Sequence, residues 1–222
     1  VVAYEIDDRL LPILDETLEA YSNVTVIHQD ILQVNLDEEI SKYFSDCEEV
    51  HLVANLPYYI TTPILMHVLE SSKQVNRLTV MLQKEVAERM AAKPNTKESG
   101  SLSIAVQYYT ETKLVIDVPK TVFMPQPKVV SSVLTLERRK QPPVEVVDEG
   151  FFFEVVQASF AHRRKTIRNN LLRFLKDRFS KEQVLAALKE ARLDESRRAE
   201  SLSMEEFADL TRSLQQYENS LI

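Results

Sequence analysis

Up to about residue 137, short apolar runs rich in β-branched residues alternate with segments whose apolar residues recur every three or four positions. Runs of the first kind are typical of β-strands, and segments of the second kind are typical of amphipathic helices. The predicted strands are 1–6, 24–27, 50–54, 77–82, 113–118 and 131–136, and the predicted helices are 8–21, 38–44, 61–71, 85–92 and 102–109. Because strands and helices alternate, we expect an α/β fold with a mostly parallel sheet covered on both faces.

The pattern changes after residue 137. Residues 138–146 are charged and contain prolines, which is typical of a linker. From residue 151 onward only helical patterns occur, at 151–160, 166–179, 181–191 and 204–217. We therefore predict two domains, an α/β domain over residues 1–140 and a small all-α domain over residues 148–222.

Polar side chains stand at the ends of three successive predicted strands. Glu5, Asp30 and Asn55 follow one another at intervals of about 25 residues. Ligands of open α/β sheets bind at the carboxyl ends of strands, where an acid can accept hydrogen bonds from ribose hydroxyls. An aspartate at such a position can also accept from an adenine amine. Taken singly, each acid could equally be a solvated side chain or a helix cap instead of a cofactor ligand. Their order predicts a nucleotide-like cofactor along one edge of the sheet.

The run Asn55-Leu56-Pro57-Tyr58-Tyr59 lies between a predicted strand and a predicted helix. An asparagine carboxamide can accept a hydrogen bond from the exocyclic amine of a base. Pro57 stiffens the turn because its φ is fixed, and Tyr58 offers a flat face on which a base can stack. The run predicts a holder for a planar, amine-bearing ring, and the alternative is an ordinary helix-entry turn.

Phe123 is a second aromatic candidate. It precedes Pro125 and Pro127, and two prolines at alternate positions favour a stiff, extended loop. Such a loop can hold Phe123 as a stacking plate opposite Tyr58. The residues leave equally open that Phe123 pins a proline-rich loop to the core.

Charge is distributed unevenly along the 222 residues, whose net charge is −7. Residues 1–50 have a net charge of −11, whereas residues 163–178 have a net charge of +6. We expect the basic run to lie on one face of the helix predicted at 166–179 and to contact RNA phosphates, with Asn169 and Asn170 adding polar contacts. The candidate contacts are Arg163, Arg164, Lys165 and Arg168. The alternative is a solvated helix face.

The remaining composition narrows the classes of function. The single cysteine, Cys47, excludes an intrachain disulfide, and with four scattered histidines it gives no metal-ligand spacing. No run is long and apolar enough to cross a membrane, so we expect a soluble, intracellular protein. With only Gly100 and Gly150, these residues contain no glycine-rich nucleotide loop.

Taken together, these motifs resemble those of the bacterial small-subunit ribosomal RNA adenine N6,N6-dimethyltransferases, the KsgA/RsmA family. The resembling segments are Asn55-Leu56-Pro57-Tyr58, residues 81–85, residues 99–103, Phe123-x-Pro-x-Pro-x-Val-x-Ser and Arg163-Arg164-Lys165-x-x-x-Asn-Asn-Leu. Ser99 departs from the family, which often has an aromatic residue there. The resemblance implies a Rossmann-like class I methyltransferase sheet with a small all-α C-terminal domain. The sheet is incomplete at its N-terminus, because the family's glycine-rich loop would precede Val1.

The resemblance also implies S-adenosyl-L-methionine as the cofactor. Glu5 would hold its ribose and Asp30 its adenine, with Ile6 and Ile31 flanking the adenine ring. Asn55 would face both the methyl donor and the target base.

The implied reaction is dimethylation of two neighbouring adenines near the 3′ end of small-subunit rRNA, on an assembling subunit and by a cytoplasmic monomer. The target adenine would leave its stack and lie between Tyr58 and Phe123. The side-chain oxygen of Asn55 and the carbonyl of Leu56 would accept from its N6 amine, and in-line transfer would need no metal. Two alternatives remain: an antibiotic-resistance dimethyltransferase of large-subunit rRNA, and a non-catalytic RNA-binding assembly or transcription factor on the same scaffold.

Overall fold

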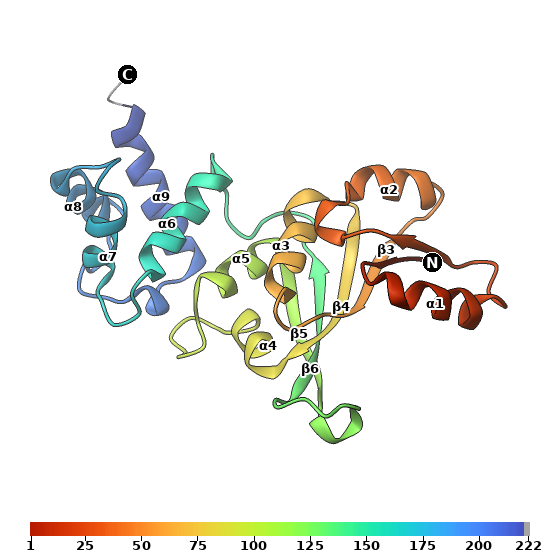
Figure 1. Ribbon diagram of the computed structural model, residues 1–222. Coiled ribbons are helices and arrows are strands. Elements are labelled where there is room, and N and C mark those ends of the chain that lie inside the picture. The colour runs from red at the N-terminus through yellow and green to blue at the C-terminus, as the bar shows by residue number, and fades with distance from the viewer. Residues whose placement is uncertain (220–222) are drawn as a thin grey trace. The chain divides into compact units, whose positions relative to one another are not determined.

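The computed structural model describes residues 1–219, which divide into two compact units, Val1–Leu82 and the part of the chain from Gln83 onward (Figure 1). Each unit is built from the elements that its own sequence favours. The predicted order of α/β elements followed by a helical region is confirmed.

The first unit begins with two parallel strands, β1 (Val2–Glu5) and β2 (Thr25–His28), in which Glu5 lies opposite His28. The single helix predicted over residues 8–21 is wrong. A 3₁₀ turn, η1 (Asp8–Leu10), precedes α1 (Leu11–Leu18), because a proline at position 12 fits only the first turn of an α-helix. No residue of α1 is buried, although its apolar residues recur with helical spacing.

A second parallel pair in this unit consists of β3 (Val50–Asn55) and β4 (Val75–Gln83). The helix between them, α3 (Thr61–Ser71), has the predicted bounds. A short η2 (Ile31–Gln33) and α2 (Leu36–Tyr43) precede this pair. The fully buried residues of the pair and of α3 are Leu65, Val68, Leu69, Leu78, Val80 and Leu82. This apolar core fixes the position of the turn that follows β3.

The second unit begins with α4 (Lys84–Met90) and α5 (Ser101–Tyr109), followed by a strand hairpin. The hairpin pairs β5 (Thr110–Val118) with β6 (Ser131–Arg138) in antiparallel fashion. Its connecting segment contains η3 (Lys120–Val122) and projects beyond the strands at the bottom of Figure 1.

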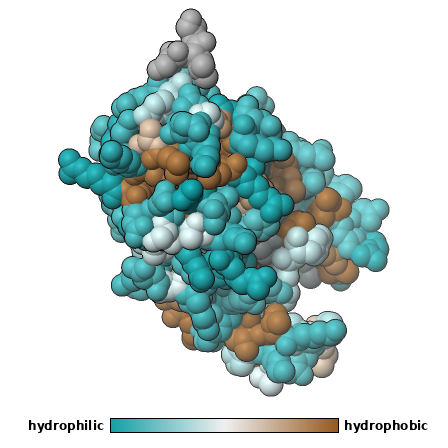
Figure 2. Space-filling view, turned by 90° about the vertical axis from the view of Figure 1, so that its left-hand side faces the viewer, coloured by the Kyte–Doolittle hydropathy of each residue, from teal (hydrophilic) through white to brown (hydrophobic). Residues whose placement is uncertain are grey.

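The remainder of the second unit is helical, as predicted. It contains α6 (Glu149–Phe160), α7 (Ile167–Phe174), α8 (Lys181–Glu190), η4 (Ala199–Ser201) and α9 (Met204–Asn219). These helices share one apolar core with two residues of α5, Ile104 and Tyr108. The face of this region seen in Figure 2 is mostly hydrophilic, with apolar residues in separate patches.

The helix predicted at 166–179 ends early, at Phe174. The N–H groups of residues 178 and 179 both turn back to the carbonyl of Leu175, at 3.0 and 2.9 Å. This turn brings the Phe179 ring to 5.9 Å from that of Phe151 and lets Arg178 pair with two glutamates of other helices. Long-range packing therefore overrides the local helical pattern.

Candidate functional site

The turn after β3 is fastened at both ends. The buried Leu56 donates its backbone N–H to the carbonyl of Met81 at 3.0 Å, which fixes the turn to β4. The Pro57 carbonyl accepts from the N–H of Ile60 at 3.2 Å and from the Thr61 hydroxyl at 2.9 Å, which fixes it to the start of α3. Asn55 is the exposed last residue of β3, and its carboxamide has no hydrogen-bond partner within the part of the chain that the structure describes. The backbone around Asn55 is thus held in place by hydrogen bonds, while its side-chain amide is left to bind a ligand.

Two tyrosines follow this turn in different environments. Tyr58 is half-buried, whereas Tyr59 is 83% exposed. The other predicted stacking residue, Phe123, is half-buried and directly follows η3, and its own backbone is extended, with φ −103° and ψ 148°. That Tyr58 and Phe123 face one another stays a prediction.

The ends of β1 and β2 lie together, as predicted. The N–H of Gln29 donates to the Glu5 carbonyl at 3.1 Å, which places Glu5 beside the segment that carries Asp30. Each acid uses one carboxylate oxygen on a nearby N–H, Glu5 on Asp7 at 2.7 Å and Asp30 on Leu32 at 3.0 Å. Among residues 1–219 their second oxygens have no partner. Both acids therefore act as local caps, which is one of the alternatives considered from the sequence. Each still has a second carboxylate oxygen that can accept a hydrogen bond.

Apolar side chains accompany these two acids. Ile6 directly follows Glu5 and is 63% exposed, and Ile31 directly follows Asp30 and is half-buried. This combination suits a ligand with a flat apolar ring and hydroxyl groups. That Asn55 lies on the same edge as the two acids stays a prediction.

The basic run does not form one helix face, contrary to expectation. Thr166 caps α7, and its side chain accepts from the N–H of Asn169 at 3.3 Å, so residues 163–165 lie in the turn before the helix. The Arg163 guanidinium donates to the Lys97 carbonyl, and Arg168 pairs with Glu195 at 2.7 Å. Two of the four predicted RNA contacts are thus held by intramolecular bonds.

Arg164 and Lys165 remain available. Both are exposed, and their side chains have no partner in the described portion of the chain. Asn170, expected to contact RNA, is buried instead; its amide donates to the carbonyls of Ser159 at 2.6 Å and His162 at 3.2 Å. It holds the basic turn against α6, and Asn169 alone of the two asparagines is exposed.

Sequence reasoning missed two bases that the fold brings to this turn. Lys97 is adjacent through its bond with Arg163, which is 66 residues away in the chain. Arg198 follows Arg197, whose carbonyl accepts from the N–H of Ile167 at 2.8 Å. Neither neighbour could be found from spacing, because the contacts connect segments far apart in the sequence.

Neither a membrane-spanning helix nor a cluster of metal ligands is found among the residues that the structure describes. No helix of the described residues has the length and apolar character needed to cross a membrane. Within the same residues, no three or more His, Cys, Asp or Glu side chains are grouped to hold a metal ion.

Comparison with known proteins gives consistent likenesses. Residues 1–216 match the family model described as ribosomal RNA adenine dimethylase. The chain is 60% identical over 219 residues to a protein of Oceanobacillus iheyensis named ribosomal RNA small subunit methyltransferase A, covering 99% of this chain and 74% of that one. A protein of the same name from Bacillus licheniformis is 57% identical over 217 residues, covering 97% of this chain and 74% of that one.

Two solved structures share the fold. A dimethyladenosine transferase from Plasmodium falciparum superposes with a TM-score of 0.79 at 21% identity, covering 97% of this chain and 82% of that one. The 23S rRNA methyltransferase ErmE has a TM-score of 0.65 at 27% identity, with the same coverage of 97% and 82%. The predicted α/β sheet with a helical C-terminal region is thereby confirmed.

Proposed function

Because this chain belongs to the ribosomal RNA adenine dimethylase family, we propose that it dimethylates the N6 amines of two adjacent adenines near the 3′ end of small-subunit rRNA. The family match over residues 1–216 is the observation that carries this proposal. The choice of the small subunit is supported by the 60% identity to a relative named for that subunit, compared with 27% to the large-subunit enzyme.

The target adenine is held by the turn after β3. The side-chain oxygen of Asn55 and the carbonyl of Leu56 accept hydrogen bonds from the N6 amine, which directs its lone pair away from the turn. Tyr58 and Phe123 stack on the two faces of the unstacked base. Support comes from the uncommitted Asn55 amide and from the anchored backbone on either side of it. The contribution to rate is positioning of a weak nucleophile.

S-adenosyl-L-methionine is the cofactor, and it supplies an electrophilic methyl group when bound. The strand-end residues fit such a molecule. Glu5 and Asp30 each retain one carboxylate oxygen to accept from ribose hydroxyls and from the adenine amine, and Ile6 and Ile31 provide apolar contact for the ring. Asn55 lies between cofactor and base in this assignment.

RNA is held largely by the helical region. In this division residues 1–140 perform methyl transfer, and residues 148–222 bind rRNA within the assembling small subunit. Arg164 and Lys165 contact phosphates directly, and Arg163 and Arg168 add positive charge while fixing the turn. We place the protein in the cytoplasm as a monomer.

The test is transfer of labelled methyl from S-adenosyl-L-methionine to unmethylated small ribosomal subunits. The chain is run beside a form that carries a family glycine-rich segment before Val1, with large subunits as a parallel substrate. Label recovered as dimethyladenine from small subunits alone is the expected result. Label from large subunits alone would establish the large-subunit alternative, and binding without label in either form would establish a non-catalytic factor.

Substitutions then assign the roles. Asn55→Ala lowers the rate of methyl transfer by about 100-fold while binding of subunits persists. Tyr58→Ala lowers the rate as well, and Tyr59→Ala, its exposed neighbour, serves as the matched control and leaves the rate unchanged. Equal loss of binding and transfer in Asn55→Ala would contradict the role of this residue.

A further inference from the structure

A lysine at the start of α4 is bonded to the base of the hairpin that β5 and β6 form. The Lys84 ammonium donates to one carboxylate oxygen of Asp117, near the end of β5, at 2.6 Å. The other oxygen of Asp117 accepts from the hydroxyl of Ser132, its partner residue on β6, at 2.7 Å. In the main chain, the N–H of Lys84 donates to the carbonyl of Val130, directly before β6, at 3.0 Å. Lys84 therefore holds both strands of the hairpin at the point where its connecting loop begins and ends.

The three side chains form one chain of hydrogen bonds, here called the Lys84 network. Ser132 is 1% exposed, so its buried hydroxyl needs the acceptor that Asp117 supplies. The hydrogen bond from Lys84 lowers the pKa of Asp117 below its ordinary value, and the same bond raises the pKa of Lys84. Both groups are therefore charged at neutral pH. Glu88, on the same helix, is 3.9 Å from the ammonium, which is beyond hydrogen-bond distance.

The loop at the end of this hairpin carries Phe123. It comprises residues 119–130 and projects beyond the strands (Figure 1). No residue of the loop is buried, so packing against a core does little to fix its position. Phe123 is half-buried, whereas its neighbours Val122 and Met124 are 66% and 99% exposed. The position of the Phe123 ring therefore depends on how the loop is attached to the two strands.

A short turn connects the Lys84 network to this ring. The carbonyl of Pro119, two residues after Asp117, accepts from the N–H of Val122 at 3.2 Å. The N–H of Phe123 donates to the carbonyl of Lys120 at 3.4 Å. These bonds close the turn η3 directly after β5. A displacement of the end of β5 is therefore transmitted to Phe123.

We propose that Lys84 is a positioning residue for the target adenine, which acts through Asp117 to hold Phe123 where it stacks on the base. This proposal rests on the proposed function, in which Phe123 contacts the base, and in it Lys84 itself touches neither base nor methyl donor. Placement of the ring affects rate, because a misplacement of about 1 Å in a reacting complex can lower the rate by as much as about 100-fold.

Hydrogen exchange tests the positioning independently of catalysis. In Lys84→Gln we expect the amides of residues 119–130 to exchange faster than in the wild type, while the amides of the helical region keep their rates. Lys113→Gln is the matched control, because it removes an exposed base from the same strand as Asp117, and its exchange is expected to match the wild type. Unchanged exchange of the loop in Lys84→Gln would overturn the proposal.

Methyl transfer to unmethylated small subunits measures the consequence, in the form that carries the glycine-rich segment before Val1. We expect Lys84→Gln and Asp117→Asn each to lower the rate at saturating subunits roughly tenfold, with binding of subunits unchanged. Lys84→Arg keeps a charged donor for the same carboxylate and retains most of the rate. Glu88→Gln removes the other carboxylate near the ammonium and is expected to match the wild type.

A combined variant shows whether Lys84 acts through Phe123. Phe123→Ala lowers the rate by itself, and adding Lys84→Gln to it causes no further loss if both changes affect the same ring. Two losses that multiply in full would overturn the proposal, as would a loss in Lys84→Gln that Lys84→Arg shares. Absence of label with the wild type would instead contradict the proposed function, and the exchange of the loop still decides whether Lys84 holds it.

Discussion

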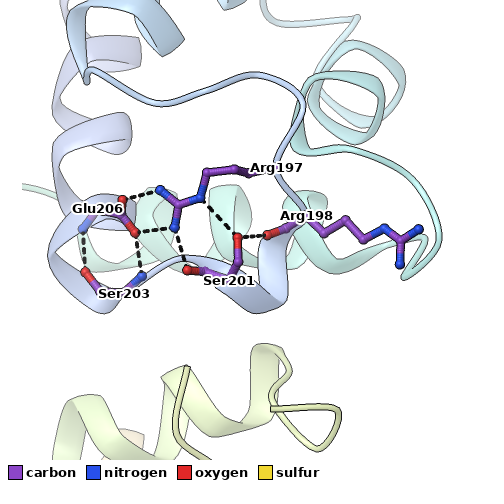
Figure 3. Close-up of polar contacts among 5 residues, drawn as sticks. All are labelled: Arg197, Arg198, Ser201, Ser203 and Glu206. Atoms are coloured by element: carbon purple, nitrogen blue, oxygen red, sulfur yellow. Dashed lines mark hydrogen bonds and ion pairs between the residues drawn. The ribbon is translucent and has the colours of Figure 1, made fainter. Parts of the chain in front are cut away.

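The Arg197–Glu206 pair is predicted to be a measurable source of stability for the helical region. The two side chains are each 32% exposed and meet in a bidentate arrangement. Glu206 also accepts from the N–H of Ser203 at 2.8 Å, and its own N–H donates to the Ser203 hydroxyl at 3.2 Å, so the same carboxylate caps α9 (Figure 3). Glu206→Gln keeps the cap acceptor but places a donor against the guanidinium.

The size of the effect lies between two limits. Exposed ion pairs contribute about 0.2–1 kcal/mol, and hydrogen bonds to charged groups contribute about 1.5–3 kcal/mol. For a bidentate pair that is one-third exposed, we expect Glu206→Gln to lower the free energy of unfolding by about 1.5 kcal/mol. In a chain of 222 residues this corresponds to a fall in melting temperature of about 5 °C.

The pH dependence of this effect has a definite sign. The hydrogen bonds from Arg197 lower the pKa of Glu206 below its ordinary value. A depressed carboxylate pKa contributes stability that is complete above the unfolded pKa, about 4.3, and is lost as pH falls through the folded pKa. The difference between wild type and Glu206→Gln is therefore the same at pH 7 and at pH 5, and shrinks at more acidic pH.

Thermal unfolding followed by circular dichroism checks both points. Asp209→Asn is the matched control, since it removes an exposed ion pair with Arg212 from the same helix and is expected to leave the midpoint unchanged. An unchanged midpoint in Glu206→Gln at pH 7 would refute the reasoning. A difference that persisted undiminished at strongly acidic pH would show that the carboxylate charge is not its source.

Three further outcomes follow from single contacts. Asn170→Leu leaves the carbonyls of Ser159 and His162 without their donor, so we expect it to lower the free energy of unfolding by about 2–3 kcal/mol and to weaken RNA binding. Asn169→Leu, at an exposed position, is the control and is expected to leave stability unchanged. Urea unfolding and a binding assay measure the two effects. Tyr108→Phe removes a hydrogen bond of 3.1 Å to Glu149 and lowers the melting temperature by about 3 °C, measured by calorimetry. Lys84→Gln removes an exposed ion pair and leaves the melting temperature unchanged at physiological salt; a clear fall would show that this pair is not screened.

Local signals predicted most of the secondary structure. The bounds of α3 were predicted without error because its start follows a stiff turn and its apolar spacing is regular. The strand β3 is one residue longer than predicted, because polar residues on either side of an apolar run mark where the strand begins and ends. The helix predicted at 166–179 is wrong because its end is set by Phe151, a residue that local spacing does not reveal.

Roles of charged residues were harder to predict than their positions. The run 163–178 contains seven bases, and sequence alone treats them as equivalent. Three of them, Arg163, Arg168 and Arg178, are bound to a backbone carbonyl or to glutamates from other segments. A guanidinium has five donors in a fixed plane, so it bridges segments well, whereas it can contact a phosphate only if those donors are left unused.

The same reasoning explains why Arg198 was overlooked beside Arg197. In sequence the two arginines lie in a mixed run, 194–200, that contains three acids and two bases and is most simply read as solvated surface. The fold separates them, because Glu206 and Ser201 together accept four hydrogen bonds from Arg197, whereas the Arg198 side chain projects away from this network (Figure 3). Which cations remain available to contact phosphates therefore depends on which of them stay unpaired after folding, and long-range contacts that the sequence does not show decide this.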